Sequence, residues 1–371
     1  MYSMFSALGK QSVDIANIGN IDTFYAHVRL NTLVHNKDVR FYLTTSTMNG
    51  YSFAMGSIKH KLLILARDSD AYARILRDAD IERLEVHAAD TPDEAEMYSE
   101  QVNIVLGEPD LIKPILPRIE HLEWVQSTWA GVRPLVEQGC RKDYLLTNVK
   151  DIFGPQMAEY VCCHMLMNER HSLERFFSQQ HKRWDTTAPG QLRNKSIGIL
   201  GVGSIGKEIA RAAKFFQMTT KGYGRNPITC EYIDQGYTQA DDLTAFVRDL
   251  DYLVSTLPDT PATIGLLDGR ILGAMKPESI LINVGRGNVL DEAALLNAIR
   301  NGQIAGAVLD VFKTEPLPLD HLFWKTKGIL ITAHTAAISF PIDIVPIFLE
   351  NFQRFQSGVP LKYCVDFNKM Y

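Results

Sequence analysis

The sequence predicts an α/β protein with two doubly wound parallel sheets, and three observations lead to this prediction. Short apolar segments rich in branched side chains recur along the chain, among them KLLILA, SIGILG and SILINVG. Helical patterns separate most of these segments, and alternating strands and helices are typical of parallel sheets with right-handed crossovers. The chain has 371 residues, more than one hydrophobic core usually organises, so two domains are expected.

The first predicted domain extends over residues 58–155. A helix is expected over residues 69–79, and residues 122–136 are expected to hold a strand, a loop of small residues and the start of a helix. Residues 337–371 are expected to complete this domain, because PIDIVPIFLENFQRFQSG has the pattern of a helix that ends at a glycine. The remaining strands are predicted at 61–66, 84–89 and 102–108.

The second predicted domain extends over residues 156–336. One long helical pattern, from about residue 155 to residue 184, marks its beginning and is apolar enough to serve in a dimer interface. Helical patterns separate most of the strands that follow, as in a parallel sheet. These strands are predicted at 196–201, 218–224, 252–258, 279–285, 304–310 and 328–334.

Residues 1–57 do not fit this alternation. They show little periodicity and lack the charged start and continuous apolar core of a secretory signal. Met55 lies just before the first clear strand. We therefore expect an N-terminal extension that is poorly ordered or reflects a mis-assigned start, which N-terminal sequencing of the native protein would decide.

Composition and charge exclude several classes of protein. The formal charge is −5, from 38 basic and 43 acidic residues, and no basic tract occurs, so neither nucleic acid nor a membrane is an expected partner. No apolar run reaches the roughly 18 residues of a membrane span. Five scattered cysteines without a C-x-x-C pair fit a reducing compartment, which predicts a cytoplasmic protein. No metal-ligand set is recognised.

A dinucleotide-binding signal begins in SIGILGVGSIGKEIARAAKFF. Gly201, Gly203 and Gly206 form G-x-G-x-x-G between an apolar strand and an amphipathic helix, which is the context of a Rossmann domain. The first glycine permits a tight turn, the second lets the backbone approach a pyrophosphate, and the third allows close helix–strand packing. Ser204 and Ile205 begin the helix whose N-terminus attracts phosphate. A glycine turn without a ligand is the alternative.

The residue that ends the second strand of this unit bears on the choice between NAD and NADP. An NAD-binding unit usually carries Asp or Glu there, for the adenosine ribose. This sequence has Gly224 at that position and Arg225 after it, so no carboxylate repels a 2′-phosphate and a guanidinium can bind one. We expect NADP(H) to be preferred, with NAD(H) possible; a solvated loop arginine is the alternative.

Three residues with catalytic potential follow consecutive predicted strands. Arg286 follows the apolar run ILINV between two glycines, Glu315 comes after GAVLD, and His334 ends ILITAH. The carboxyl ends of parallel strands meet at one edge of a sheet, where ligands bind in doubly wound folds. Each residue alone has an ordinary explanation, such as a surface ion pair. Their occurrence together behind a dinucleotide fingerprint favours catalysis.

These motifs resemble the D-isomer-specific 2-hydroxyacid dehydrogenase family over about residues 58–371. The matching stretches are GILGVGSIGKEIA, LPDTPATIGLL, LINVGRGNVLDEAALLNAIRNGQIAGAVLDVFKTEPLP and ITAHTAAI. Within the family, QSTWAGVRPL, LFW and PLKYCVDFNKMY are most similar to the glyoxylate/hydroxypyruvate reductase branch. The chain departs from the usual pattern at Arg133, often Asp in the family, which leaves the substrate open, and at Ala333, usually Pro.

The resemblance implies a Rossmann cofactor domain, a flavodoxin-like substrate domain and a homodimer. It implies reduction of a small 2-oxo acid, glyoxylate or hydroxypyruvate, to the D-2-hydroxy acid, with His334 as general acid, Glu315 as its partner and Arg286 on the substrate carboxylate. The implied substrate side also includes Trp129, Ala130, Gly131 and Trp324. The implied cofactor side also includes Thr256, Leu257, Pro258, Thr263, Val284, Gly285 and Asp310, the last against the nicotinamide carboxamide.

Two alternatives stay open. Another 2-hydroxyacid dehydrogenase, such as phosphoglycerate dehydrogenase, would need further cationic groups near the pocket, and Arg133 leaves that possible. A non-catalytic NAD(P)-sensing protein would share the fold, and measurable turnover would exclude it. Formate oxidation is not expected, because the residue paired with the histidine is there a glutamine and here is Glu315.

Overall fold

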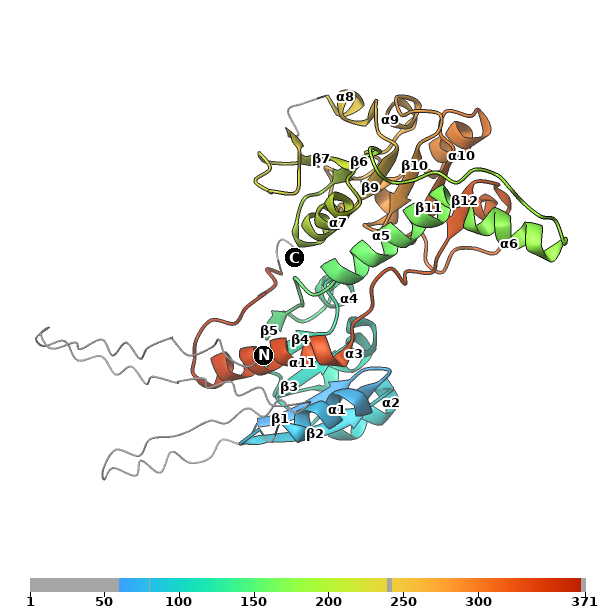
Figure 1. The fold of residues 1–371 in the computed structure, drawn as a ribbon. Coiled ribbons are helices and arrows are strands. Elements are labelled where there is room, and N and C mark those ends of the chain that lie inside the picture. The colour runs from blue at the N-terminus through green and yellow to red at the C-terminus, as the bar shows by residue number, and fades with distance from the viewer. Residues whose placement is uncertain (1–59, 80, 239–241, 368–371) are drawn as a thin grey trace, which may run out of the picture. The chain divides into compact units, whose positions relative to one another are not determined.

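The computed structural model describes residues 60–79, 81–238 and 242–367, and the expected N-terminal extension over residues 1–57 lies outside these ranges (Figure 1). The described strands form two sheets, one with the order β2-β1-β3-β4-β5 and one with the order β12-β11-β10-β9-β6-β7-β8. Every strand pair is parallel. The prediction of an α/β protein with two parallel sheets is confirmed.

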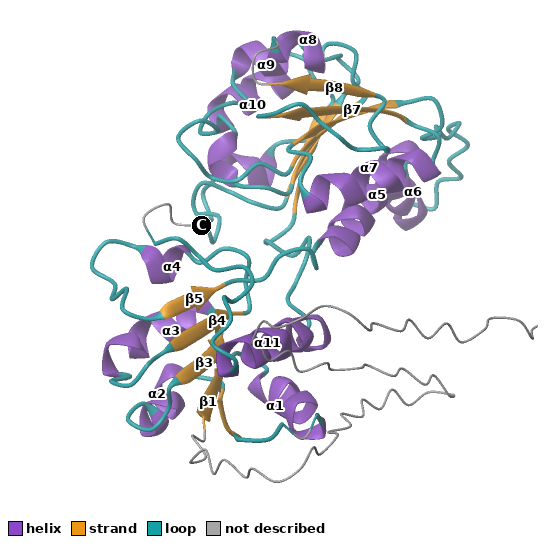
Figure 2. Ribbon diagram, turned by 90° about the vertical axis from the view of Figure 1, so that its left-hand side faces the viewer, coloured by secondary structure: helices purple, strands orange, loops and turns teal. Residues whose placement is uncertain are grey.

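The five-stranded sheet has helices on both faces (Figure 2). Along β1 (His60–Leu65), an inner strand of this sheet, Leu63 and Leu65 pack into one core while Leu62 and Ile64 pack into another, because successive side chains point to opposite faces. Its strands are β1 (His60–Leu65), β2 (Leu84–Ala89), β3 (Ile104–Gly107), β4 (Trp124–Ser127) and β5 (Leu145–Thr147). Its helices are α1 (Ser69–Asp78), α2 (Pro92–Ala95), α3 (Pro109–Ile115), α4 (Arg133–Val136) and α11 (Pro341–Gln356).

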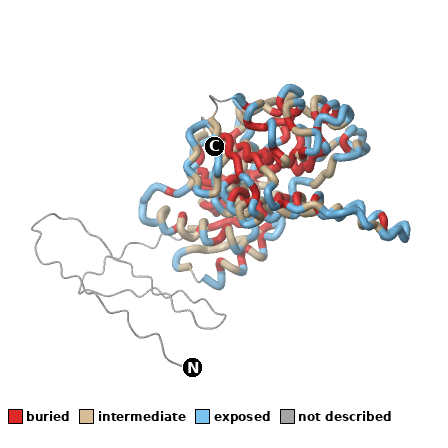
Figure 3. The backbone as a smooth tube through the Cα atoms, turned by 45° about the horizontal axis from the view of Figure 1, so that its top comes forward, coloured by how far each residue is buried: buried red, intermediate tan, exposed pale blue. Residues whose placement is uncertain are grey.

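The seven-stranded sheet follows the same rule, since Leu281 and Ile282 of one strand belong to cores on opposite faces. Figure 3 shows the buried residues of the described chain in red, gathered in the interior, and the exposed residues in pale blue at the surface. The strands are β6 (Ser196–Leu200), β7 (Thr219–Gly224), β8 (Gln235–Thr238), β9 (Tyr252–Ser255), β10 (Ile280–Asn283), β11 (Gly306–Leu309) and β12 (Ile329–Ile331). The helices are α5 (Gly154–Glu169), α6 (Ser172–Gln180), α7 (Ser204–Phe215), α8 (Leu243–Val247), α9 (Gly269–Gly273) and α10 (Glu292–Arg300).

The strand order of this sheet determines where a ligand can bind. The chain runs outward from β6 through β7 to β8, and then returns to place β9 on the other side of β6. This reversal creates a topological switch point, and in open α/β sheets ligands bind beyond the carboxyl ends of the strands at such a point. Gly201 follows β6 and Thr256 follows β9, so both lie at the switch point.

The single helix expected from residue 155 to residue 184 is wrong. Helix α5 ends at Glu169, and His171 takes a left-handed conformation with φ 51° before α6 begins. A left-handed residue interrupts the helical hydrogen-bond ladder, and the Arg175 side chain donates to the free Arg170 carbonyl at 3.0 Å. Hydrophobic periodicity continued across the break and concealed it.

Two short strands were missed, β5 with three residues and the edge strand β8 with the polar sequence QGYT. Neither has the apolar run that identified the others. Helix α11 shares a core with α1, and its Phe348 stacks on Trp124 with ring centroids 5.1 Å apart. The domain boundaries at residues 155 and 337 stay a prediction.

Candidate active site

The three expected catalytic residues lie beyond neighbouring strands of the seven-stranded sheet. Arg286 follows β10, Glu315 follows β11 and His334 follows β12, and these strands are adjacent and parallel. Their carboxyl ends therefore meet at one edge, as the sequence predicted.

His334 and Glu315 form a hydrogen-bonded pair. The imidazole Nδ1 lies 2.8 Å from Glu315 Oε2, and the other carboxylate oxygen accepts a hydrogen bond from the Phe312 backbone N–H at 2.9 Å. The hydrogen bond to Glu315 holds the pKa of His334 above its ordinary value, against burial and the nearby Arg286 charge. Burial opposes ionisation of Glu315, but the hydrogen bond from His334 and that from the Phe312 amide outweigh it and keep its pKa below its ordinary value.

Arg286 is exposed, and no carboxylate pairs with it among the residues that the structure describes. Its Nη1 donates to the Gly285 carbonyl at 2.7 Å, which fixes one side of the guanidinium and leaves its other donors available. The flanking glycines have a steric reason. A side chain on Gly285 would approach the Leu257 carbonyl oxygen to 2.6 Å, and one on Gly287 would overlap the Phe312 backbone. A side chain on Gly131 of the expected substrate loop would meet Arg286 Nη2 at 3.0 Å.

The glycine loop connects β6 to α7. Gly201 has φ 93°, a conformation that favours glycine, and a side chain on Gly206 would overlap the Gly201 carbonyl. Gly203 differs from both, because an added methyl group would meet no protein atom within 4 Å. The fold therefore requires Gly201 and Gly206 but leaves open space above Gly203. Ser204 and Ile205 begin α7 at the edge of that space.

The other expected cofactor residues surround the same sheet edge. Arg225 is exposed directly after β7, and no described residue forms an ion pair with it. The Thr256 hydroxyl donates to the Gly201 carbonyl at 2.7 Å, and the Thr263 hydroxyl donates to the Pro258 carbonyl at 2.6 Å. The first bond links the loop after β9 to the loop after β6, and the second lies within the loop after β9. Leu257 follows Thr256, and Val284 with Gly285 follows β10.

Asp310 is buried, with 1% of its surface exposed, at the end of β11. Its Oδ1 accepts hydrogen bonds from the Thr332 hydroxyl at 2.5 Å and the Thr335 N–H at 2.8 Å, and its Oδ2 accepts one from the Ala336 N–H at 3.1 Å. The carboxylate expected to meet the nicotinamide is thus already bonded to the loop that carries His334.

The expected substrate loop is held by residues that sequence patterns did not reveal. Ser127 Oγ bonds both the backbone N–H and the carbonyl of Trp129 at 2.9 Å. The Asn148 amide donates to the Ala130 carbonyl at 2.8 Å. Asn148 follows β5, a strand that was not predicted, so no signal marked it. Trp324 is 49% exposed, and its indole N–H donates to the Pro318 carbonyl; within the described residues no hydrogen bond joins it to Arg286 or His334.

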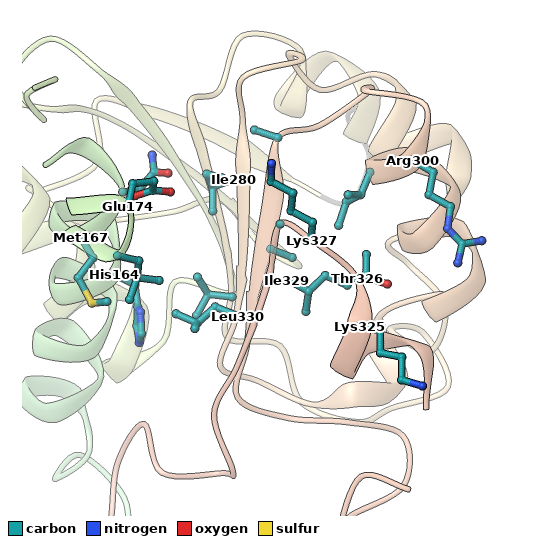
Figure 4. A pocket seen from close by; sticks show the side chains of 17 residues that line it. His164, Met167, Glu174, Ile280, Arg300, Lys325, Thr326, Lys327, Ile329 and Leu330 are labelled. Atoms are coloured by element: carbon teal, nitrogen blue, oxygen red, sulfur yellow. The ribbon is translucent and has the colours of Figure 1, made fainter. Parts of the chain in front are cut away.

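A cavity of about 750 Å³ lies at the opposite edge of the seven-stranded sheet (Figure 4). Ile280, Ala307 and Ile329, near the amino ends of β10, β11 and β12, line it together with His164 and Leu173. Arg286 and His334 follow the carboxyl ends of these strands, and neither of them lines the cavity. In the described part of the chain no group of three His, Cys, Asp or Glu side chains could hold a metal ion, and no helix is long and apolar enough to cross a membrane.

Comparison with known proteins identifies the family to which the chain is similar. The family model for the NAD-binding domain of D-isomer specific 2-hydroxyacid dehydrogenases matches residues 162–336. Glyoxylate/hydroxypyruvate reductase A of Serratia proteamaculans is 36% identical over 203 residues, which cover 55% of this chain and 64% of the relative. The reductase A of Photorhabdus laumondii is 34% identical over 236 residues, which cover 62% of this chain and 75% of the relative. The chain thus spans slightly less than two thirds of the first of these relatives.

Solved structures of the family also match. A D-isomer specific 2-hydroxyacid dehydrogenase family protein from Aeromonas salmonicida has a TM-score of 0.81 and 40% identity, covering 83% of this chain and 99% of the other. An enzyme of this family from Xanthobacter autotrophicus, in complex with NADPH and MES, has a TM-score of 0.74 and 29% identity, covering 84% and 100%. The NADPH-dependent glyoxylate/hydroxypyruvate reductase of Sinorhizobium meliloti, in complex with NADP and sulfate, has a TM-score of 0.72 and 26% identity, covering 84% and 100%.

Proposed function

Because the chain belongs to the D-isomer-specific 2-hydroxyacid dehydrogenase family, we propose that it reduces a small 2-oxo acid, glyoxylate or hydroxypyruvate, with NADPH. One observation carries the proposal. The hydrogen-bonded pair of His334 and Glu315, at 2.8 Å, lies on the same sheet edge as the glycine loop and as Arg286, whose guanidinium forms no ion pair with any described residue. A proton donor, a carboxylate that orients it and a free cation are the groups that reduction of a keto acid requires.

Arg286, His334 and Glu315 each have a separate role in the proposed reaction. NADPH, when bound, supplies the hydride. Arg286 binds the substrate carboxylate and polarises the carbonyl, because a planar guanidinium presents several donors in a fixed fork. His334 donates a proton to the carbonyl oxygen from Nε2, the ring nitrogen that does not face Glu315. Glu315 fixes that tautomer and stabilises the imidazolium before the proton leaves.

The residues present fit a dinucleotide. The open space above Gly203 admits a pyrophosphate, and the N-terminus of α7 directs backbone N–H groups toward it. Arg225 is exposed and has no ion-pair partner among the described residues, so its guanidinium is available for a 2′-phosphate, and Gly224 stands where an NAD-binding unit usually has an acid. These features support a preference for NADPH over NADH. Asp310 retains capacity at Oδ2 for one further donor, such as the nicotinamide carboxamide.

Arg133 does not favour a phosphorylated substrate. Its guanidinium faces two carboxylates, Glu137 at 3.9 Å and Asp259 at 3.6 Å, which offset its charge. Trp129, Ala130 and Gly131 precede it in the loop that we assign to the substrate, whereas Trp324 remains a weaker candidate. A small uncharged side chain on the 2-oxo acid is therefore the better fit.

Helix α6 and the residues after it support a homodimer. Phe176, Phe177 and Trp184 are 54%, 59% and 92% exposed, and such a group of aromatic side chains is typically buried against a partner. Sedimentation of the wild type should give a dimer, and the double variant Phe176→Ser/Phe177→Ser should give a monomer. A monomeric wild type would contradict this assignment. A cytoplasmic location stays a prediction.

Steady-state kinetics test the proposed function. Purified protein should oxidise NADPH with glyoxylate and with hydroxypyruvate, more slowly with NADH, and Arg286→Ala should abolish turnover while NADPH still binds. Turnover with 3-phosphohydroxypyruvate alone would favour the phosphoglycerate dehydrogenase alternative. No turnover with any 2-oxo acid, in protein that binds NADPH, would favour the sensing protein.

A further inference from the structure

The loop that carries His334 is attached to β11 through the buried carboxylate of Asp310. The donors to this carboxylate come from Thr332 on one side of His334 and from Thr335 and Ala336 on the other. The His334 backbone N–H also donates to the Asp310 carbonyl, at 2.8 Å. The Asp310 residue therefore holds the chain both before and after the histidine.

The hydrogen bonds to Asp310 constrain an unusual backbone, because His334 has a left-handed conformation with φ 56°. A residue other than glycine rarely takes this conformation, which persists only where surrounding contacts hold it. The hydrogen bonds to Asp310 are the contacts that impose it here. Weakening them would let the loop relax and would change where the imidazole points.

A tyrosine on helix α5 completes the arrangement. The Tyr160 hydroxyl lies 2.7 Å from Thr332 Oγ1. An ionised carboxylate only accepts hydrogen bonds, so the Thr332 hydroxyl must donate its hydrogen to Asp310, and the Tyr160 hydroxyl must then be the donor to Thr332. Burial raises the pKa of Tyr160 well above its ordinary value, so this donor stays protonated. The result is a one-way relay from Tyr160 through Thr332 to Asp310.

We propose that Tyr160 is a positioning residue for His334, which it orients through the hydroxyl of Thr332 and the carboxylate of Asp310. The relay joins α5 to the loop after β12, segments that are 172 residues apart in sequence. Because adjacent hydrogen bonds polarise one another in a buried setting, losing the first donor weakens the bonds that follow it. The consequence for turnover rests on the proposed function, but the orientation of His334 does not.

The charges around this relay are few. His334 faces Glu315, Arg286 and Asp310. Tyr160 faces Asp310, Cys163 and the ring of His164, whose centroid lies 4.3 Å from its own. Burial lowers the pKa of His164, so near neutral pH it is uncharged and does not compete with His334 for the Asp310 charge.

The test is a histidine NMR titration of the free full-length protein, with the His334 signal assigned from its loss in His334→Gln. Tyr160→Phe removes only the relay hydroxyl. Tyr252→Phe is a matched control, because the Tyr252 hydroxyl also bonds residues of α5, Asn168 at 2.9 Å and Glu169 at 2.6 Å, away from the His334 loop. We expect Tyr160→Phe to lower the His334 titration midpoint, since a relaxed loop weakens the bond to Glu315, and Tyr252→Phe to leave it unchanged.

Substitution of Thr332 gives an independent reading if Tyr160→Phe folds poorly. Thr332→Val should lower the His334 midpoint and Thr332→Ser, which keeps the hydroxyl, should restore it. In turnover, Tyr160→Phe and Thr332→Val should lower kcat about fivefold with KM for the 2-oxo acid and the Kd of NADPH unchanged. An unchanged His334 midpoint in both variants would overturn the relay. A wild type without turnover would overturn the proposed function, while the titration would still decide the relay.

Discussion

Replacing Gly203 with alanine separates a cofactor contact from a requirement of the fold. An added methyl group would meet no protein atom within 4 Å, and the backbone at this position is extended, with φ −83° and ψ −160°, which alanine also adopts. Stability should therefore be unchanged or rise by about 0.4–1 kcal/mol, because alanine reduces the entropy of the unfolded chain.

The same methyl group would stand where the pyrophosphate approaches the backbone. Forcing the phosphates away weakens charge-assisted hydrogen bonds, each worth about 1.5–3 kcal/mol. At 1.4 kcal/mol for each factor of ten, the Kd of NADPH should rise roughly ten- to hundredfold. Gly206→Ala is the contrasting variant, since its methyl group would overlap the Gly201 carbonyl and should destabilise the fold itself.

Two measurements on each variant distinguish a loss of cofactor binding from a loss of stability. Urea denaturation gives the free energy of unfolding, and fluorescence titration gives the Kd of NADPH. If Gly203→Ala bound NADPH as tightly as the wild type, the glycine loop could not be the pyrophosphate site. A large loss of stability in Gly203→Ala would contradict the conclusion that a methyl group at this position meets no protein atom.

Three further variants test other parts of the site. Arg225→Asp should raise the Kd of NADPH about tenfold or more without weakening NADH, since only NADPH carries the 2′-phosphate; equal losses for both would remove Arg225 from the site. Glu315→Gln should lower kcat about tenfold and move the basic limb of the reduction profile to lower pH, because reduction needs protonated His334 and Glu315 is what raises its pKa; an unmoved limb would contradict the pairing. Gly287→Ala should destabilise the protein by about 3 kcal/mol or more because its methyl group would overlap the Phe312 backbone, whereas Gly269→Ala, with only a distant methyl neighbour at 3.8 Å, should have little effect in the same denaturation assay.

The sequence predicted the parts of the site that lie in contiguous motifs. Arg286 and His334 each follow an apolar strand, and parallel strands bring their carboxyl ends to one edge, so their proximity could be inferred without coordinates. The glycine loop could also be inferred, because its strand, turn and helix are consecutive in the sequence. The steric requirement for glycine at position 287 could not be inferred, since the Phe312 backbone that a side chain would overlap comes from another segment.

The supporting contacts depend on packing between distant segments, which periodicity does not record. Nothing in the helical pattern of α5 distinguished Tyr160 from a core residue, yet its hydroxyl reaches Thr332. Asn148 could not be found because the three-residue strand before it has no clear pattern. The break at His171 was concealed because apolar residues continue on both sides of it.

The most direct test of the central claim follows the hydride itself. Protein incubated with hydroxypyruvate and with NADPH deuterated at the transferable position of the nicotinamide should yield D-glycerate that carries deuterium on the carbon that was the carbonyl. Deuterium in L-glycerate, or glycerate without deuterium, would contradict hydride transfer to the face of the carbonyl that the D-specific family uses.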